Sequence, residues 1–461
     1  MDFKNQIDQV MDDMVKDIQG LIQIKSVEAP AEGNMPFGRG VQDALEYTLK
    51  LGQDMGFTVK NVDNYGGHIE FGEGEELIGV LAHLDVVPEG SNWDYDPYGA
   101  TLVDGKIIGR GTIDNKGPAV SALYAMKALK DAGVPVNKRV RLILGTNEET
   151  GWEGINYYFK KEEKPHMGFT PDADFPAIHG EMGILIFDLV KKFEERLPDG
   201  GIEILKIAGG NAPNMVPDYA EAHLKVTKPI SHILEAYNKD KDGKLEMTEE
   251  NGVTLIQSFG VSAHGSTPES GKNAISYLMD FLNYLDLQIG DVTNFVRDYA
   301  RLIGLDYNGQ NIGCDLEDEY GKLVFNVGEI DFGQDEGRIS VNIRYPITEN
   351  VDTVYKGMEE ALEFTKIQIE KHEHMAPIYL PPDHELIQAL MGTYTEVTGD
   401  ATPPITIGGG TYARSMDNAV AFGPLFPGKE ETAHQKNEYI EIEDLRTMTR
   451  IYANALYKLT R

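Results

Sequence analysis

The chain of 461 residues has a single cysteine, Cys314, and few basic residues for its size. One thiol cannot form an intrachain disulfide or build a thiolate metal cluster. The 42 Lys and Arg residues stand against 75 Asp and Glu, a formal charge of −33, which argues against nucleic acid and anionic membranes as partners. No apolar run approaches the roughly 18 residues of a membrane span. Residues 1–25 lack the basic start and apolar centre of a signal peptide, so we expect a cytoplasmic protein.

The length of the chain indicates more than one domain, because a single core seldom organises so many residues. As far as residue 170, apolar strands alternate with amphipathic helices, a pattern typical of an α/β domain whose mixed sheet is mainly parallel. From about residue 183 half-buried strands prevail, with helices expected near 273–286 and 351–371. Helical spacing returns at 383–398 and 442–458. We therefore predict an α/β domain formed by residues 1–182 and 379–461, with an α+β domain inserted at 183–378.

A buried strand predicted over residues 77–83 ends in His83, and Asp85 follows two residues later. Residues two apart on a strand point to the same side. An imidazole there can bind a metal through one nitrogen, while a carboxylate accepts a hydrogen bond from the other. A lone His-x-Asp pair is more often a buried histidine with a satisfied hydrogen bond, so this motif does not decide the function by itself.

Further candidates follow the same placement, because they lie where predicted strands end or loops begin. Asp114 alone could cap the helix that follows it, and an isolated Glu148-Glu149 pair could be a solvated turn. In open α/β sheets, however, ligands bind at the carboxyl ends of the strands. The shared position favours one assembled site formed by His83, Asp114, Glu148, Glu149 and Asp172.

Nitrogen and oxygen donors without sulfur suit zinc, manganese or cobalt. With His434 from the C-terminal part of the chain, the candidate ligands are too many for one catalytic metal that keeps an open position. They suit two metals that share a bridging carboxylate and activate a water between them. Such a site also needs a base for the proton of that water, and Glu148 is the candidate.

A second metal pattern lies at residues 238–249, where the spacing of acidic residues matches an EF-hand calcium loop. A true EF-hand has a helix on both sides of the loop. Here the sequence after Glu249 is typical of a hairpin turn and a strand. We interpret the segment as an exposed acidic turn, with calcium binding as the alternative.

The segments AHLDVVPEG, GRGTIDNKGP, GTNEETGW, TPDADFP, NMVPD, GVSAHGSTP, GGGTYAR and AHQKNEY occur in this order over nearly the full length. Together they resemble the co-catalytic metallopeptidase family of aminoacylases and carboxypeptidases, and within it the PepV-type dipeptidases. The resemblance implies two divalent ions, zinc first and manganese as the alternative. It assigns His83, Asp114 and Asp172 to one ion, and Asp114, Glu149 and His434 to the other.

The resemblance also implies roles outside the metal ligands. Asp85 would orient His83, Glu148 would be the general base, and the peptide bond after Asp114 would be cis. In the inserted domain, which would act as a lid, His264 would stabilise the oxyanion with help from Asn214. The substrate carboxylate would be held by Arg344. Further substrate contacts would come from nearby Arg414, Gly409, Gly410 and Thr411.

The double-sized lid resembles that of PepV-type enzymes, which supply the oxyanion histidine within one chain, so we expect an active monomer. The predicted substrates are dipeptides with a free N-terminus, whose amine Asp174 could bind. The nearest alternative is an N-acyl-amino-acid amidohydrolase or carboxypeptidase of the same family, and a catalytically silent binding protein is a more distant one.

Overall fold

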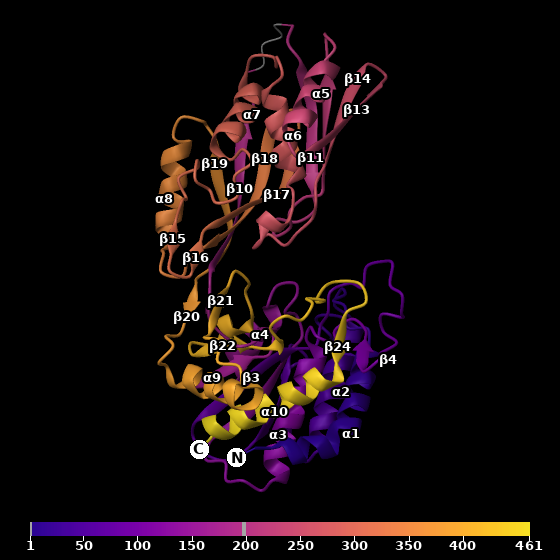
Figure 1. Ribbon diagram of the computed structural model, residues 1–461, viewed down its shortest axis with the longest axis vertical. Coiled ribbons are helices and arrows are strands. Elements are labelled where there is room, and N and C mark those ends of the chain that lie inside the picture. The colour runs from indigo at the N-terminus through magenta and orange to yellow at the C-terminus, as the bar shows by residue number, and fades with distance from the viewer. Residues whose placement is uncertain (1, 196–199) are drawn as a thin grey trace. The chain divides into compact units, whose positions relative to one another are not determined.

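The computed structural model describes residues 2–195 and 200–461, which form two compact units (Figure 1). The first unit contains the residues up to Gly180 together with Tyr379–Thr406 and Gly410–Arg461. The second unit contains Glu181–Ile378 and Ile407–Gly409. Each unit has a hydrophobic core of its own, so each is described separately.

The first unit is built on a nine-stranded mixed sheet. Its central strands run parallel, and the strands toward both edges are antiparallel. This confirms the predicted α/β class. The order is β1 (Thr58–Asn61), β2 (Gly67–Phe71), β6 (Arg139–Gly145), β3 (Leu77–His83), β7 (Met167–Thr170), β22 (Ala419–Phe422), β9 (Ala177–Glu181) and β20 (Ile378–Tyr379), with β21 (Ile405–Ile407) also paired to β9.

Helices cover both faces of this sheet because its strands alternate in direction along the chain. Leu142 and Leu144 of β6 face the core beneath α3, whereas Arg141 between them contacts Tyr158 of α4 on the other face. Helices α9, α10, α3 and α1 pack in a row (Figure 1). The helices are α1 (Lys4–Ile22), α2 (Arg39–Asp54), α3 (Lys116–Asp131), α4 (Glu153–Lys161), α9 (Glu385–Thr398) and α10 (Ile442–Leu459).

Two small sheets complete the first unit and position loops around the carboxyl ends of the central strands. One places the C-terminal β24 beside β5, so that the backbone N–H of Gly109 donates to the Glu438 carbonyl at 2.8 Å. The other joins β8 to β23 in parallel. Their strands are β4 (Thr101–Val103), β5 (Lys106–Ile108), β24 (Tyr439–Glu441), β8 (Ala173–Asp174) and β23 (Pro424–Leu425).

The second unit is an eight-stranded antiparallel sheet with helices packed against one face, as predicted for an α+β domain. Burial alternates along β12 and β14, which is the pattern of a sheet covered on one side. The strand order is β13 (Lys244–Glu250), β14 (Val253–Phe259), β12 (Tyr219–Lys225), β11 (Glu203–Gly210), β17 (Val324–Phe332), β18 (Glu336–Tyr345), β10 (Gly183–Lys192) and β19 (Gln368–Met375). The helices are α5 (Ser231–Asp240), α6 (Ala274–Asn283), α7 (Asp291–Leu302) and α8 (Val351–Leu362), and β15 (Glu317–Asp318) pairs with β16 (Gly321–Lys322).

Two expectations for this unit need correction or completion. The helix predicted over 351–371 ends at Leu362, because Lys366 adopts φ +60° and the chain turns into strand β19. After the acidic turn at 241–243 the chain enters β13 and the hairpin to β14. The helix that an EF-hand requires after its loop is therefore replaced by a strand.

None of the helices in residues 2–195 and 200–461 is long and apolar enough to cross a membrane.

Candidate metal centre

Parallel strands bring the candidate ligands of the first unit to one edge of the sheet. His83 is the last residue of β3, while Glu148 and Glu149 follow the end of β6 at Gly145. Asp172 comes two residues after β7, and β3 pairs in parallel with both β6 and β7. Because neighbouring parallel strands end on the same side, these side chains converge. Asp114 joins them from the loop before α3.

The carboxylate of Asp114 lies between the two histidines. Its Oδ1 is 2.9 Å from His83 Nε2, and its Oδ2 is 2.9 Å from His434 Nε2. Asp172 Oδ1 lies 3.5 Å from the same nitrogen of His83, and Glu149 Oε2 lies 3.2 Å from His434 Nε2. Each histidine thus faces one terminal carboxylate and shares Asp114, the arrangement of a bridged two-metal site.

Glu148 belongs to the same cluster. One donor atom each from His83, Glu148 and Asp172 lie within 4.8 Å of one another, and so do donor atoms of His83, Asp114 and Glu149. The burial is uneven, because His83 is 1% exposed whereas the His434 side chain is 54% exposed. His434 therefore closes the cluster from its open side.

The backbone fixes the proton on His83. Its Nδ1 donates to the backbone carbonyl of Asp85 at 3.0 Å, and a carbonyl can only accept. Nε2 is therefore left with the lone pair that a metal ligand needs. The Asp85 carboxylate, expected to orient His83, lies 3.6 Å from Nδ1, too far for a hydrogen bond. Instead it accepts the backbone N–H of Glu149 at 3.1 Å.

Two buried residues that the sequence did not single out hold the ligand loops in place. The Asn115 amide donates to Asp172 Oδ1 at 3.0 Å and to the Pro171 carbonyl, and its oxygen accepts the N–H of His83 at 3.3 Å. Glu438 accepts the N–H of Asp114 at 3.2 Å and pairs with buried Arg110 at 2.7 Å. The Asp114–Asn115 peptide bond is cis, as the family resemblance implied.

A third such residue is Tyr412, which is fully buried. Its ring packs edge-on against His83 with centroids 6.3 Å apart, and against Trp152 at 5.4 Å. Gly145 at the end of β6 leaves room for it, because a Cβ there would lie 2.3 Å from the tyrosine ring. The GGGTYAR segment therefore supports the metal centre through an aromatic contact.

The electrostatics of the cluster reflect an excess of carboxylates in a buried place. Burial, followed by the negative charge of Asp172, raises the pKa of Glu148 well above its usual range. Burial and then the charge of Asp114 raise the pKa of Glu149 to about 7. Burial lowers the pKa of His83, but Asp172 and Asp114 outweigh it and the pKa is raised. These shifts show that the bare protein lacks positive charge at this point.

Divalent metals fit this donor set. Five carboxylates meet two imidazoles here, all oxygen and nitrogen donors of the kind that zinc and manganese accept. Two divalent ions would offset four of the five negative charges, which buried protein groups alone do not neutralise. The five carboxylates are those of Asp85, Asp114, Glu148, Glu149 and Asp172.

A small cavity of about 90 Å³ adjoins the cluster within the first unit. Asp114 and Asp172 form one end of it, and the remaining lining is mostly apolar, with Pro424 and Leu425 of β23. Glu431 adds a carboxylate to the lining, and its charge contributes, after burial, to a raised pKa of about 6 at Asp174. The cavity can therefore take an apolar group close to a positive one.

The remaining predicted residues divide between the units. Thr411, Gly410 and Arg414 belong to the first unit, where Thr411 caps a short 3₁₀ helix through the N–H of Ala413. Asn214, His264, Arg344 and Gly409 belong to the second.

Within the second unit, Arg344 and His264 are held by local hydrogen bonds. Arg344 is 5% exposed, and its guanidinium donates to Asn342 Oδ1 at 3.0 Å and to the Gly408 carbonyl at 2.9 Å. His264 Nδ1 accepts the backbone N–H of Ser266 at 3.2 Å. Because an N–H can only donate, the neutral ring of His264 carries its proton on Nε2.

These features define the class: an α/β enzyme with a histidine–carboxylate cluster suited to divalent metals. Residues 79–458 match the model of peptidase family M20/M25/M40. The chain is 40% identical over 468 residues to "Putative dipeptidase YtjP" of Bacillus subtilis (strain 168), with 100% of both chains covered. It is 39% identical over 470 residues to "Putative dipeptidase SSP1012" of Staphylococcus saprophyticus, with 99% of each covered. The chain belongs to the M20/M25/M40 peptidase family and is a hydrolase.

Solved structures share the fold at low sequence identity. Human carnosine dipeptidase 1 aligns with a TM-score of 0.62 and 15% identity over 99% of this chain and 98% of that one. The M20 metallo-carboxypeptidase Sso-CP2 from Sulfolobus solfataricus aligns with a TM-score of 0.59 and 18% identity over 97% and 99%. The family resemblance drawn from the sequence motifs is confirmed.

Proposed function

We propose that this hydrolase is a metal-dependent dipeptidase that cleaves the peptide bond of dipeptides with a free N-terminus. The observation that carries the proposal is the Asp114 carboxylate, whose two oxygens each lie 2.9 Å from a different histidine. The names of the relatives, both called dipeptidases and both matched over their full length, support the substrate class.

Two divalent ions, zinc or manganese, would be held by the ligands already described. His83 and Asp172 would bind one ion, Glu149 and His434 the other, with Asp114 shared between them. When bound, such a pair lowers the pKa of a water between the ions and polarises the scissile carbonyl. The fixed Nδ1–H of His83 keeps its Nε2 aimed at the ion, and Asn115 does the same for Asp172.

Glu148 would act as the general base. It lies in the same 4.8 Å group as His83 and Asp172, yet the expected ligand sets leave it free to move a proton. Its carboxylate takes the proton of the attacking water and later delivers that proton to the leaving amine. Because Glu148 is adjacent to Glu149 in the chain, one turn supplies both a ligand and a base.

The ends of the substrate would be bound by groups of both units. Glu431 and Asp174, beside the cavity near Asp172, would bind the free amine. Arg344 would bind the terminal carboxylate. His264 would donate its Nε2 proton to the oxyanion, since its Nδ1 accepts from Ser266. We assign additional substrate contacts to Asn214, Arg414, Gly409, Gly410 and Thr411.

The test follows amino-acid release from L-dipeptides and from their N-acetylated forms, with zinc or manganese and with a chelator. We expect metal-dependent cleavage of the free-amine dipeptides alone. Glu148→Gln should lower kcat by about 10²- to 10⁴-fold, the usual contribution of a general base, without losing metal. Glu46→Gln, at an exposed carboxylate on α2, is the matched control and should keep full activity.

Faster cleavage of the acetylated forms would assign the chain to N-acyl-amino-acid hydrolysis instead. Activity on neither set, with metal bound, would indicate a silent binding protein on a peptidase fold.

A further inference from the structure

The segment that carries Asn214 is joined by its backbone to the loop that carries His264. Met215 and His264 form an antiparallel bridge, and the Gly265 N–H donates to the Asn214 carbonyl at 2.7 Å. One residue further on, the Val216 N–H donates to the Ala263 carbonyl at 2.9 Å. Within the second unit the two side chains proposed for the oxyanion therefore share one backbone frame.

This frame is fastened to the sheet by Asn326, a residue of β17 that is 1% exposed. Its Nδ2 donates to the carbonyls of Pro213 at 2.8 Å and of Met215 at 2.9 Å. Both partners can only accept, so the amide nitrogen must be the atom that faces them. The two carbonyls flank Asn214, and one side chain thus fixes the backbone on both sides of it.

The neighbouring glycines show how closely the segment is seated. A Cβ on Gly328, two residues after Asn326, would lie 2.4 Å from the Ala212 carbonyl oxygen and 2.4 Å from the Pro213 Cα. On the opposite side, a Cβ on Gly265 would lie 2.8 Å from the Asn214 carbonyl oxygen. The segment is held between β17 and the His264 loop, with no space for a side chain on either.

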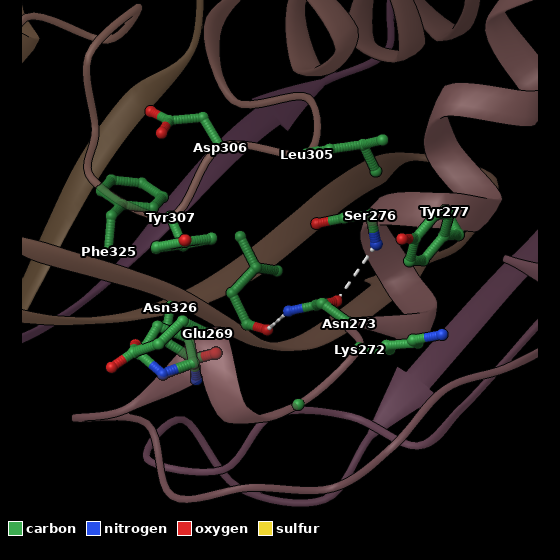
Figure 2. A pocket seen from close by; sticks show the side chains of 13 residues that line it. Glu269, Lys272, Asn273, Ser276, Tyr277, Leu305, Asp306, Tyr307, Phe325 and Asn326 are labelled. Carbon is green, nitrogen blue, oxygen red and sulfur yellow. Dashed lines mark hydrogen bonds between the residues drawn. The ribbon is translucent and has the colours of Figure 1, made fainter. Parts of the chain in front are cut away.

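The far end of the same loop is fastened by a second asparagine. Asn273 donates to the Val327 carbonyl at 2.7 Å and accepts the Ser276 N–H at 3.1 Å, as Figure 2 shows for Ser276. A cavity of about 120 Å³ lies against this part of the loop and is lined by both Asn273 and Asn326. A cavity offers no packing contacts, so hydrogen bonds rather than side-chain packing secure the loop on this side.

We propose that Asn326 is a positioning residue for the hydrolysis: its amide sets the place of Asn214 and, through the shared backbone frame, of His264. This inference rests on the proposed oxyanion role of those two residues. Donors that stabilise an oxyanion act only at the correct distance from it. Their displacement by a fraction of an ångström therefore lowers kcat, whereas ground-state binding of the dipeptide is little affected.

The experiment compares Asn326→Ala and Asn326→Ser with wild type in the full-length, metal-loaded enzyme. We expect Asn326→Ala to lower kcat by about 10- to 100-fold, with KM changed less than about twofold. Asn326→Ser, which keeps one donor, should lie between. Asn350→Ala is the matched control, because it removes an asparagine that caps α8 of the same unit through the Asp352 N–H. It should keep the wild-type kcat.

Double variants separate positioning from a general loss of stability. In a His264→Ala or Asn214→Ala background, Asn326→Ala should cost far less than it does alone, because the group it positions is already gone. A wild-type kcat for Asn326→Ala, or a full additional loss in both backgrounds, would overturn the inference. Wild-type kcat in both His264→Ala and Asn214→Ala would instead refute the proposed oxyanion role itself. If Asn326→Ala does not fold, Asn326→Ser and Gly328→Ala test the same seat.

Discussion

His83 and His264 carry their protons on opposite ring nitrogens, and in each case a backbone group decides which. A carbonyl accepts from Nδ1 of His83, so its Nε2 has a free lone pair. A backbone N–H donates to Nδ1 of His264, so its Nε2 bears the hydrogen. The first ring can bind a cation and the second can donate to an anion. The two residues are thereby fitted to different tasks without any difference in residue type.

Another buried histidine gives a prediction about pH. Burial and then the charge of Arg141 lower the pKa of His68 to about 3, and its Nδ1 lies 2.8 Å from the Tyr158 hydroxyl. Below the ordinary histidine pKa of about 6.5 the unfolded chain takes up a proton that the folded one refuses. Stability is therefore lost as the pH falls from 6.5 toward 3, by about 1.4 kcal/mol per pH unit.

We expect His68→Gln to lose stability less steeply than wild type between pH 6.5 and pH 4.5, by about 2 kcal/mol over the interval. Urea unfolding at a series of pH values measures this. Exposed His232→Gln controls for the loss of a histidine as such. Equal slopes for wild type and His68→Gln would contradict the prediction.

Single residues also mark the limit of prediction from sequence. His83, Asp114, Glu149 and Asp172 could be proposed because each follows a recognisable strand or precedes a helix. Glu438 and Asn115 could not be proposed from spacing, because their roles are contacts with distant parts of the chain. The hydrogen bond from Asp114 to Glu438 joins residues 324 positions apart. Only the folded sheet brings such pairs together.

At the scale of elements, the junction of β6 with Tyr412 gives a second prediction. A methyl group on Gly145 would lie 2.3 Å from the buried tyrosine ring, which has no space to retreat. Gly145→Ala should cost about 1–3 kcal/mol of stability through overpacking. It should also lower kcat, because Tyr412 packs against His83.

Thermal unfolding and dipeptide hydrolysis measure the two effects of Gly145→Ala. Gly333→Ala is the matched control, since a Cβ there meets nothing within 4 Å. If Gly145→Ala unfolded at the wild-type temperature with full activity, the contact between β6 and Tyr412 would not support the site.

Elements were predictable where one face is buried and the apolar spacing is regular, as in β3, which matches the expected 77–83. The end of α8 was not, because helical spacing continues past Leu362 while the turn at Lys366 interrupts the helix. Strand β19 pairs with β10, about 180 residues earlier in the chain, and most of its side chains are exposed. Its hydrogen bonds rather than its apolar pattern define it.

For the whole molecule, the proposed catalytic set includes residues of both units of one chain, and we predict an active monomer. Light scattering should give a mass near 51.1 kDa, and the specific activity should not change on dilution. A mixture of His264→Ala and Glu148→Gln chains should stay inactive, because neither can lend its intact residue to the other. Recovery of activity in that mixture would show that subunits exchange His264.

The discontinuity of the first unit has a consequence for the chain during its synthesis. Asp172 is made 262 residues before His434, and β22, α9 and α10 also follow the inserted second unit. At about 5–20 residues per second on the ribosome, roughly 15–50 seconds separate these two residues. Throughout that interval the nascent chain holds one ligand face of the centre but cannot close it. Acquisition of the full pair of ions is thus a late event, timed by translation of the C-terminal segment.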